Sequence, residues 1–202
     1  MSEVAVTDPA KWPLVASLSD AWKVRLSTFR HLHNTLYFTT FCGRVFARGA
    51  NDQGLLGVGH REPTDEPVEL PELSNQDVID FNGGVDFRVA LTKSGRVYTW
   101  NGQNSLRPRP LEGSPGAFAS IECGAHYTAG ITEDRRLYVW GDFNEHLPTP
   151  TRVDSEDFQV GPILSTVPKL IVVKPDNVSL YECGPLKNIV LQLKNESNET
   201  PS

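Results

Sequence analysis

Few residues in this sequence have the types and spacing that metal binding or proton transfer requires. The most suggestive is His126, which follows Glu122 and Cys123 within four positions. Imidazole, thiolate and carboxylate groups are the side chains that bind zinc. A structural zinc site needs four such ligands and a catalytic site at least three, and no second cluster supplies the others. The sequence therefore predicts no metal site around His126.

The other candidates for chemistry are also incomplete. His31 and His33 lie two positions apart, on one face of a strand, without a third ligand nearby, whereas His60 and His146 have the surroundings of loop residues. The glycine-rich run 49–59 lacks the Lys-Ser/Thr of a P-loop and the strand–Gly-x-Gly-x-x-Gly–helix context of a dinucleotide site. No Ser or Cys stands in a nucleophile-elbow sequence. We predict a protein that is not an enzyme, with no catalytic residue, no metal and no cofactor.

A repeated pattern predicts the elements that would position any site. Residues 43–49 read Gly-Arg-Val-Phe-Ala-Arg-Gly, and related sequences return at 95–101, 135–141 and, faintly, 178–184. The copies recur about 40 to 50 residues apart, which is typical of an array of similar supersecondary units. Runs rich in β-branched and aromatic residues, separated by turn residues, predict strands at 35–39, 44–47, 77–81, 89–92, 96–100, 118–121, 128–131 and 137–140.

The predicted strands form antiparallel meanders. Residues 93–95 and 133–135 have the composition of hairpin turns. Gly84 and Gly124 precede the next strands at matching offsets, so we expect close backbone approach or positive φ there. Meanders repeated at this period favour propeller blades over a sandwich. The predicted fold class is all-β, an incomplete β-propeller of about three to four blades with a short N-terminal helix.

Three regions follow along the chain. Residues 1–30 are predicted to be an N-terminal extension in which Ser19 caps a short helix whose apolar face includes Leu18, Trp22 and Leu26. Residues 31–184 are predicted to hold the incomplete propeller repeats. Residues 154–176 within them are hard to assign, although 170–173 has the composition of a buried strand. We expect residues 185–202 to be a C-terminal strand and a disordered tail.

Composition limits the classes of function. The net charge of −6 disfavours nucleic acid as the main ligand, because duplex binders present basic surfaces to phosphates. The one basic stretch, 107–110, is interpreted as a solvated proline-rich loop. No apolar run approaches the roughly 20 residues that span a membrane, and no basic segment with an apolar core opens the sequence. We expect an intracellular protein, cytoplasmic and/or nuclear, whose three cysteines form no disulfide framework.

Residues 43–67 resemble a repeat of the regulator of chromosome condensation family. The family's marks are a Gly-x-Val-Tyr-x-Trp-Gly strand, a Gly-x-Leu-Gly-x-Gly loop and a later Pro-x-x-Val, and the sequence Cys-Gly-Ala-His-Tyr-Thr-Ala at 123–129 is similar to the start of another family strand. Residues 11–13 and 18–19 resemble the opening of the subgroup that carries such repeats ahead of a BTB domain. The resemblance covers 31–153 well and implies a structural role for His126, with its imidazole hydrogen-bonded inside the ring.

Departures from the family pattern are equally informative. Arg48 stands where the family has Trp, and Asn101 stands where it has Gly. The Gly-x-Leu-Gly loop is missing after Trp100 and after Trp140. The family's ring has seven blades, whereas this sequence supplies three and part of a fourth. Since an arc exposes apolar blade faces at its ends, we expect a partner, a second copy, a missing remainder or a rearranged end to cover them.

These features predict a non-enzymatic protein-interaction module, an adaptor or scaffold whose subgroup resemblance implies work related to ubiquitin ligases. Its partners are predicted to be proteins, with no membrane and with self-association through open propeller edges as one mode. Loops on a rigid scaffold commonly carry recognition, and the predicted partner-binding residues are Asn51, Asp52, Gln53, His60 and Arg61. The alternatives are guanine-nucleotide exchange or chromatin-associated regulation of a small GTPase, or a partial product without independent function.

Overall fold

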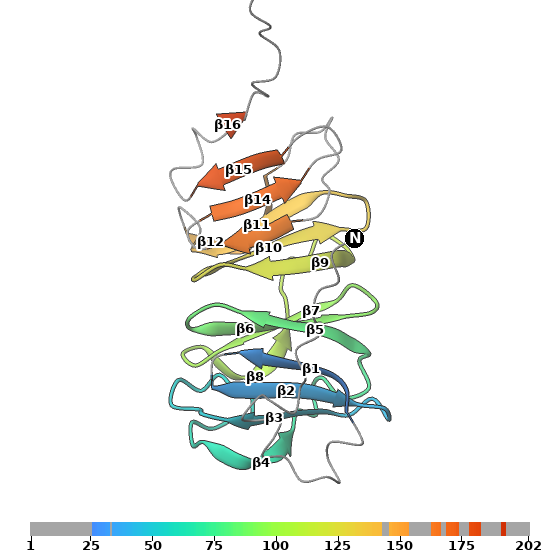
Figure 1. The fold of residues 1–202 in the computed structure, drawn as a ribbon, viewed down its shortest axis with the longest axis vertical. Helices are drawn as coiled ribbons and strands as arrows, with labels where there is room; N and C mark the ends of the chain where they lie inside the picture. Colours follow the sequence, from blue (N-terminus) through green and yellow to red (C-terminus); the bar gives the residue numbers. More distant parts are fainter. Residues whose placement is uncertain are drawn as a thin grey trace, which may run out of the picture. The chain divides into compact units, whose positions relative to one another are not determined.

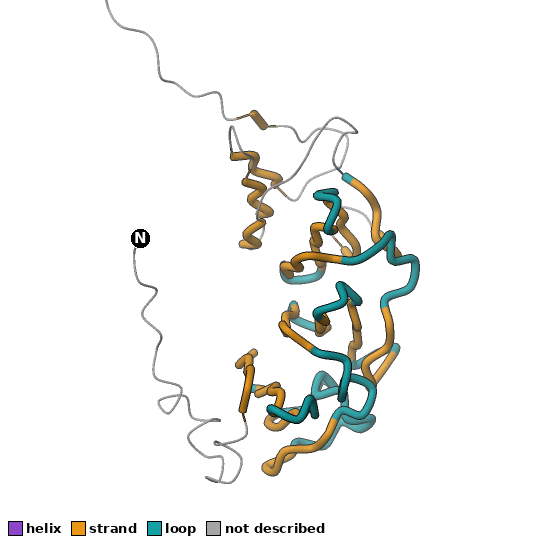
Figure 2. The backbone as a smooth tube through the Cα atoms, turned by 90° about the vertical axis from the view of Figure 1, so that its right-hand side faces the viewer, coloured by secondary structure: helices purple, strands orange, loops and turns teal. Residues whose placement is uncertain are grey.

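The computed structural model describes residues 26–32, 34–142, 146–153, 163–166, 169–173, 178–182 and 191–192. All of the described chain is strand, turn or loop (Figure 2), which confirms the all-β class. The predicted helix after Ser19 lies outside the described residues, apart from Leu26, which begins the first strand. That strand starts five residues before position 31, because the sequence Leu-Ser-Thr-Phe-Arg-His-Leu pairs as an antiparallel strand with the segment that follows it.

The described strands form four-stranded antiparallel sheets (Figure 1). The first sheet contains β1 (Leu26–Leu32), β2 (Thr35–Thr40), β3 (Val45–Gly49) and β4 (Thr64–Glu69). The second contains β5 (Val78–Gly83), β6 (Phe87–Thr92), β7 (Val97–Asn101) and β8 (Ser105–Pro110). The third contains β9 (Phe118–Cys123), β10 (Tyr127–Thr132), β11 (Leu137–Asp142) and β12 (His146–Arg152). A fourth pairs β13 (Ile163–Thr166), β14 (Lys169–Val173), β15 (Val178–Glu182) and β16 (Leu191–Gln192).

The chain divides into two compact units. The first is made of residues 1–82 and 86–111 and holds the first two sheets, and the second is made of residues 83–85 and 112–202. In every sheet the strands are neighbours in the order of the sequence, as in a meander. The run at 170–173, predicted as a strand, lies in β14, and the faint fourth copy of the repeat lies in β15.

The third and fourth strands of the first three sheets pair in the same register. Phe46 pairs with Glu69, Tyr98 with Pro110 and Tyr138 with Arg152. Each of these pairs is followed by a shift in register two residues further along, before Gly49, Asn101 or Gly141. The sequence repeat is therefore also a structural repeat, and the shift places Arg48, Trp100 and Trp140 at equivalent positions.

The turn between the second and third strands is also the same in each sheet. In each turn a threonine hydroxyl accepts a hydrogen bond from the backbone N–H four residues later. The pairs are Thr40–Arg44 (3.2 Å), Thr92–Arg96 (3.1 Å) and Thr132–Arg136 (3.2 Å). The residue before each arginine is left-handed, with φ between 61° and 79°. The turns predicted at 93–95 and 133–135 are thus confirmed, and both are built by local hydrogen bonds that short polar residues provide.

Strands β4, β8 and β12 escaped prediction from the sequence because they are outer strands that contain proline, and β1 and β13 were not predicted as strands either. β4, β8 and β12 each lie at an edge of their sheet. Residues 107–110, predicted to be a solvated loop, belong to β8, and that prediction was wrong. An edge strand uses its N–H groups on one side only, so Pro108 and Pro110 remove no hydrogen bond that a further strand would accept.

Aromatic packing joins the first and second sheets within their unit. The Tyr37 ring stacks on Phe81 at 5.4 Å and meets Trp100 edge-on at 5.8 Å between centroids. Arg30 adds a polar link, because it donates to the Asp80 carboxylate at 2.6 Å and to the Phe81 carbonyl at 3.0 Å. These contacts tie β1 and β2 to β5 and β7, so the two sheets share one core.

Gly141 offers a test of the repeated register. Its φ is 92°, and a Cβ added there would lie 2.6 Å from the His126 carbonyl oxygen, while a Cβ on Gly116 would meet nothing within 4 Å. We expect Gly141→Ala to lower the free energy of unfolding by about 2 to 3 kcal/mol, since it combines left-handed strain with a steric clash. Gly116→Ala is the control and should be nearly neutral. Equal midpoints for the two variants in urea unfolding would contradict the register.

Candidate interaction surface

The loop between β3 and β4, residues 50–63 and here called the long loop, is held from within by one side chain. The Asn51 amide oxygen accepts from the Leu56 N–H at 2.9 Å, and the amide nitrogen donates to the carbonyls of His60 at 2.7 Å and Glu62 at 3.1 Å. Asn51 is accordingly 1% exposed. It shapes the long loop and presents no side chain to the surface, unlike what the sequence suggested for a partner-binding residue.

The long loop is also anchored from outside, at the backbone of Leu55. The Leu55 carbonyl accepts from the Tyr37 hydroxyl at 2.5 Å and from the Trp100 indole N–H at 2.6 Å, and both bonds are buried. Burial raises the pKa of the Tyr37 hydroxyl, which keeps this donor protonated. One carbonyl of the first repeat is thus bound by β2 of its own sheet and by β7 of the next.

The glycines of this region serve close backbone approach. A Cβ on Gly102 would lie 1.6 Å from the Gln53 carbonyl oxygen, so the long loop touches the tight turn between β7 and β8. The Arg61 guanidinium donates to the Gly102 carbonyl at 2.6 Å and strengthens that contact. Within the glycine-rich run, a Cβ on Gly54 would lie 2.4 Å from the Leu106 side chain and one on Gly59 would lie 2.7 Å from the Arg107 side chain, so these glycines serve close packing against β8.

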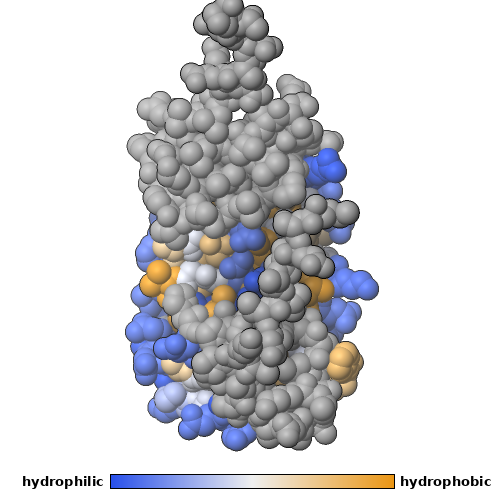
Figure 3. Space-filling view, in the orientation of Figure 1, coloured by the Kyte–Doolittle hydropathy of each residue, from blue (hydrophilic) through white to orange (hydrophobic). Residues whose placement is uncertain are grey.

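The exposed side chains of the long loop lie on either side of its buried middle, residues 54–58, and are here called the tip. They include Asp52, Gln53, His60 and Arg61, and the His60 imidazole lies 3.4 Å from the Glu62 carboxylate. Four of the five predicted partner-binding residues are thus exposed on this loop, and together they carry mixed charge. Figure 3 shows that hydrophilic residues cover much of the described surface in that view, with a few hydrophobic ones between them.

Asn101 closes the tight turn that the second repeat has in place of a long loop. Its side-chain oxygen accepts from the backbone N–H groups of Gln103, Asn104 and Ser105, at 3.2, 2.6 and 3.3 Å. An asparagine can close a tight turn in this way, whereas the glycine found at this position in the first and third repeats has no side chain to do so. The asparagine thus suits the short connection of the second repeat, while the third repeat has an equally short connection with a glycine, Gly141, at this position.

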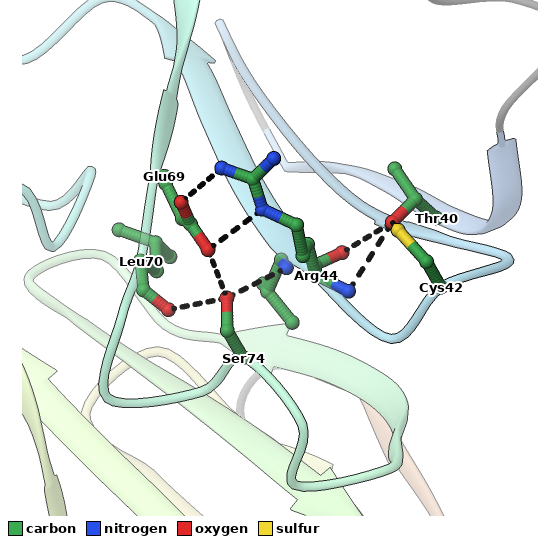
Figure 4. A network of polar contacts seen from close by, with 7 residues as sticks. Thr40, Cys42, Arg44, Glu69, Leu70 and Ser74 are labelled. Carbon is green, nitrogen blue, oxygen red and sulfur yellow. Dashed lines mark hydrogen bonds and ion pairs between the residues drawn. The ribbon is translucent and has the colours of Figure 1, made fainter.

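A polar network covers the other ends of β2 and β3 (Figure 4). Arg44 donates both Nε, at 3.0 Å, and Nη2 to the Glu69 carboxylate, and the Ser74 hydroxyl donates to the same carboxylate at 2.9 Å. Ser74 also accepts from the Val45 N–H at 3.0 Å. The hydrogen bond from Arg44 holds the pKa of Glu69 below its usual value, and the hydrogen bond from Ser74 lowers this pKa further by a smaller amount. The network fixes the segment after β4 against β3.

Cys42 lies in this network as a turn residue. Its sulfur is 3.2 Å from the Thr40 hydroxyl, and this hydrogen bond, with one from the Arg44 backbone, lowers the pKa of the exposed thiol. Ser94 and Asp134 make the same contact with their own threonines, at 3.0 and 2.5 Å. Short polar side chains fill this position in all three turns, so the position of the Cys42 thiol gives no indication of catalysis.

The remaining candidates from the sequence do not converge on a site. Among the described residues, no group of three His, Cys, Asp or Glu side chains is placed to hold a metal ion. The His126 side chain is exposed, and its carbonyl accepts from the Asp142 N–H at 2.7 Å. His146 pairs with Asp142 at 2.6 Å. His33 and the side chain of His31 lie outside what is described.

Gly124 is confirmed as a site of close approach, because a Cβ there would lie 2.1 Å from the Tyr127 ring. Cys123 is partly buried and lies 3.5 Å from the Thr128 hydroxyl, so it is less enclosed than a core residue.

No helix in the described part of the chain is long and apolar enough to cross a membrane.

Comparison with protein families identifies the repeat. The models named "Regulator of chromosome condensation (RCC1) repeat" match residues 42–91 and 118–146. These two segments are similar to RCC1 repeats. Together with the four-stranded meanders and their shared register, this match supports a β-propeller fold built from RCC1 repeats. The predicted number of blades in the whole protein stays a prediction.

Curated relatives are similar to about half of this chain. The E3 ubiquitin-protein ligase HERC2 of Mus musculus is 35% identical over 111 residues, which is 49% of this chain and 2% of HERC2. The regulator of chromosome condensation of Mus musculus is 33% identical over 117 residues, 52% of this chain and 27% of that protein. The chain therefore spans a small part of these relatives.

Solved structures agree on the fold. Human WBSCR16 matches with a TM-score of 0.67 at 19% identity, over 78% of this chain and 47% of that one. Prp20p from Saccharomyces cerevisiae, whose structure was described with its binding to Gsp1p and histones, matches with a TM-score of 0.60 at 15% identity, over 69% of this chain and 41% of that one. At such identities the likeness concerns the fold alone.

The RCC1 repeat of the first sheet differs most from the pattern at Arg48. This side chain is 8% exposed, and its Nε makes no hydrogen bond. At the equivalent position of the second repeat, the Trp100 indole N–H donates to the long loop. Arg48 thus places a buried donor without a partner where an RCC1 repeat normally has an indole, which is unfavourable for stability.

A double-mutant cycle tests the anchor at Leu55. Tyr37→Phe and Trp100→Phe each remove one of two donors, and each should lower the free energy of unfolding by about 1 to 2 kcal/mol. The double variant leaves a buried carbonyl without a donor, so the combined loss should exceed the sum of the single losses by about 1 kcal/mol or more. Strict additivity in urea unfolding would show that the two bonds do not share one acceptor.

The Glu69 carboxylate predicts a dependence on pH. Because its folded pKa is lowered, its contribution to stability is present above the unfolded value of about 4.3 and is lost as pH falls through the folded value. Glu69→Gln should therefore melt below the wild type at pH 7 by a small margin that shrinks with salt. The margin should vanish in acid, as thermal melts between pH 7 and pH 3 would show. A margin that is constant across this range would exclude the ion pair as its cause.

Proposed function

We propose that this protein is a non-enzymatic protein-interaction module that binds its partner through the tip of the long loop. The observation that carries the proposal is the fixed conformation of that loop. Its backbone is bound at Leu55 by two buried donors, and its interior is filled by Asn51. The exposed tip therefore needs little ordering when a partner binds, which lowers the entropic cost of association.

The chemistry of the tip supports a protein surface as the ligand. Asp52, Gln53, His60 and Arg61 offer one acid, one amide, one imidazole and one guanidinium, all exposed. Such a mixture suits the polar rim of a protein interface, while it lacks the single-sign charge that phosphates attract. The acidic net charge of the chain favours the same reading.

The relatives support the same class of function. HERC2 is named as an E3 ubiquitin-protein ligase, and the structural study of Prp20p reports its binding to Gsp1p and histones. We propose that this chain acts as an adaptor or scaffold of comparable kind, in which RCC1 repeats present a partner. An assignment to the subgroup with a BTB domain, the division into 1–30, 31–184 and 185–202, and self-association through open propeller edges remain parts of this proposal.

Charge reversal at the tip tests the proposal. Tagged wild type is used to capture partners from cells, and quantitative mass spectrometry identifies those that recur. Asp52→Lys with His60→Glu should reduce capture of the specific partner by about tenfold or more, because tip residues would be central to the interface. Arg61 is left unchanged, since it also binds the Gly102 carbonyl. Asp65→Lys, an exposed change on β4, is the matched control and should preserve capture.

The experiment also separates this function from nucleotide exchange. If the partner is a small GTPase, its release of bound nucleotide is measured with and without the chain, and we expect no acceleration. Equal capture by the wild type and the tip variant, with a circular dichroism spectrum that shows both folded, would overturn the long loop as the binding surface.

A further inference from the structure

A pocket lies at the ends of β2 and β3 that face away from the long loop. It has a volume of about 470 Å³ and lies between the turn after β2 and the segment before β5. The residues that line it are Thr39, Thr40, Phe41, Cys42, Gly43, Asn75, Asp77 and Val78. All belong to the first compact unit, and none is a lysine or arginine.

Phe41 is not required by the turn that carries it. The equivalent residues of the second and third repeats are Lys93 and Glu133, although the turns share the same hydrogen bonds. The Phe41 side chain is nevertheless 79% exposed. A large aromatic side chain exposed at a position where the fold accepts a lysine or a glutamate is typical of a contact surface for a ligand.

Asp77 supplies the charge on the other side of the pocket. Its φ is 51° and that of Asn75 is 61°. The segment is fixed at both residues, because the Asn75 N–H donates to the Gly43 carbonyl at 2.8 Å and the Asp77 carbonyl accepts from the Lys93 N–H at 2.8 Å. Asp77 is exposed, and within the described residues its carboxylate forms no ion pair.

The nearest basic residue of the turn is already engaged. Arg44 directs its guanidinium to Glu69, so it does not neutralise Asp77 (Figure 4). The pocket therefore combines an exposed aromatic ring, a carboxylate on a fixed backbone and hydroxyl and amide groups. These are the features that bind a planar cation, because a guanidinium stacks on an aromatic ring while its N–H groups pair with a carboxylate.

We propose that this pocket binds an arginine side chain of a protein partner. The guanidinium stacks on Phe41 and donates to the Asp77 carboxylate. Arginine fits better than lysine, since its planar group can stack and form two parallel hydrogen bonds at once. This site is distinct from the tip of the long loop and stands whether or not the tip binds a partner.

The test uses the full chain and a capped tripeptide, acetyl-Gly-Arg-Gly-amide. The Cys42 thiol lines the pocket, so its alkylation by N-ethylmaleimide reports occupancy, and Cys123 serves as the internal reference. We expect the arginine peptide to slow alkylation of Cys42 and not of Cys123. Peptides with citrulline or glutamate in place of arginine should bind about tenfold more weakly or not at all, because they lack the cation.

Two variants locate the effect. Asp77→Asn removes the charge and keeps the shape, since asparagine tolerates the left-handed conformation, and it should weaken the arginine peptide by about tenfold. Phe41→Lys introduces the residue that the second repeat carries in this turn and should abolish binding. Asp65→Asn is the control and should bind as the wild type. Equal protection by the arginine, citrulline and glutamate peptides, or unchanged affinity in Asp77→Asn, would overturn the proposal.

Discussion

The Leu55 carbonyl has two donors, the Tyr37 hydroxyl and the Trp100 indole, and it lies where water cannot replace either one. A backbone group buried in this way needs a partner, and a long loop buries many of them. Donors on β2 and β7 allow the loop to pack between the two sheets instead of over the solvent. The common core, the internal position of Asn51 and the exposed tip all depend on this arrangement.

The repeats separate residues that form the scaffold from residues that face solvent. Threonine and a short polar residue recur in each turn because their side chains make hydrogen bonds there. The left-handed residue and the arginine that follows it also recur, and the arginine takes part in these bonds through its backbone. The residue after the threonine is free to vary, and it is Phe41, Lys93 or Glu133. A side chain that the scaffold does not specify is available for recognition, so comparing repeats within one chain gives information that a single repeat does not.

The sequence was sufficient for the all-β class, for the inner and middle strands of the first three sheets other than β1, and for the two turns at 93–95 and 133–135. It was insufficient for β4, β8 and β12, since an edge strand tolerates the prolines and charges that usually indicate a loop. It placed Leu26 on a helix because a spacing of four residues keeps side chains on one face of a helix and also on one face of a strand. Asn51 looked exposed beside Asp52 because its hydrogen bonds reach residues up to eleven positions away.

The long loop of the first repeat and Trp100 of the second join the first two sheets. The first repeat has the long loop but carries Arg48 where the indole belongs, and the second has Trp100 but closes its own turn with Asn101. The first repeat thus keeps the loop and the second keeps the indole that binds it. The described chain contains one complete pair of loop and indole. Since the register of the third and fourth strands is the same in all three repeats, the loop and the indole are what distinguish the pairing of the first two sheets.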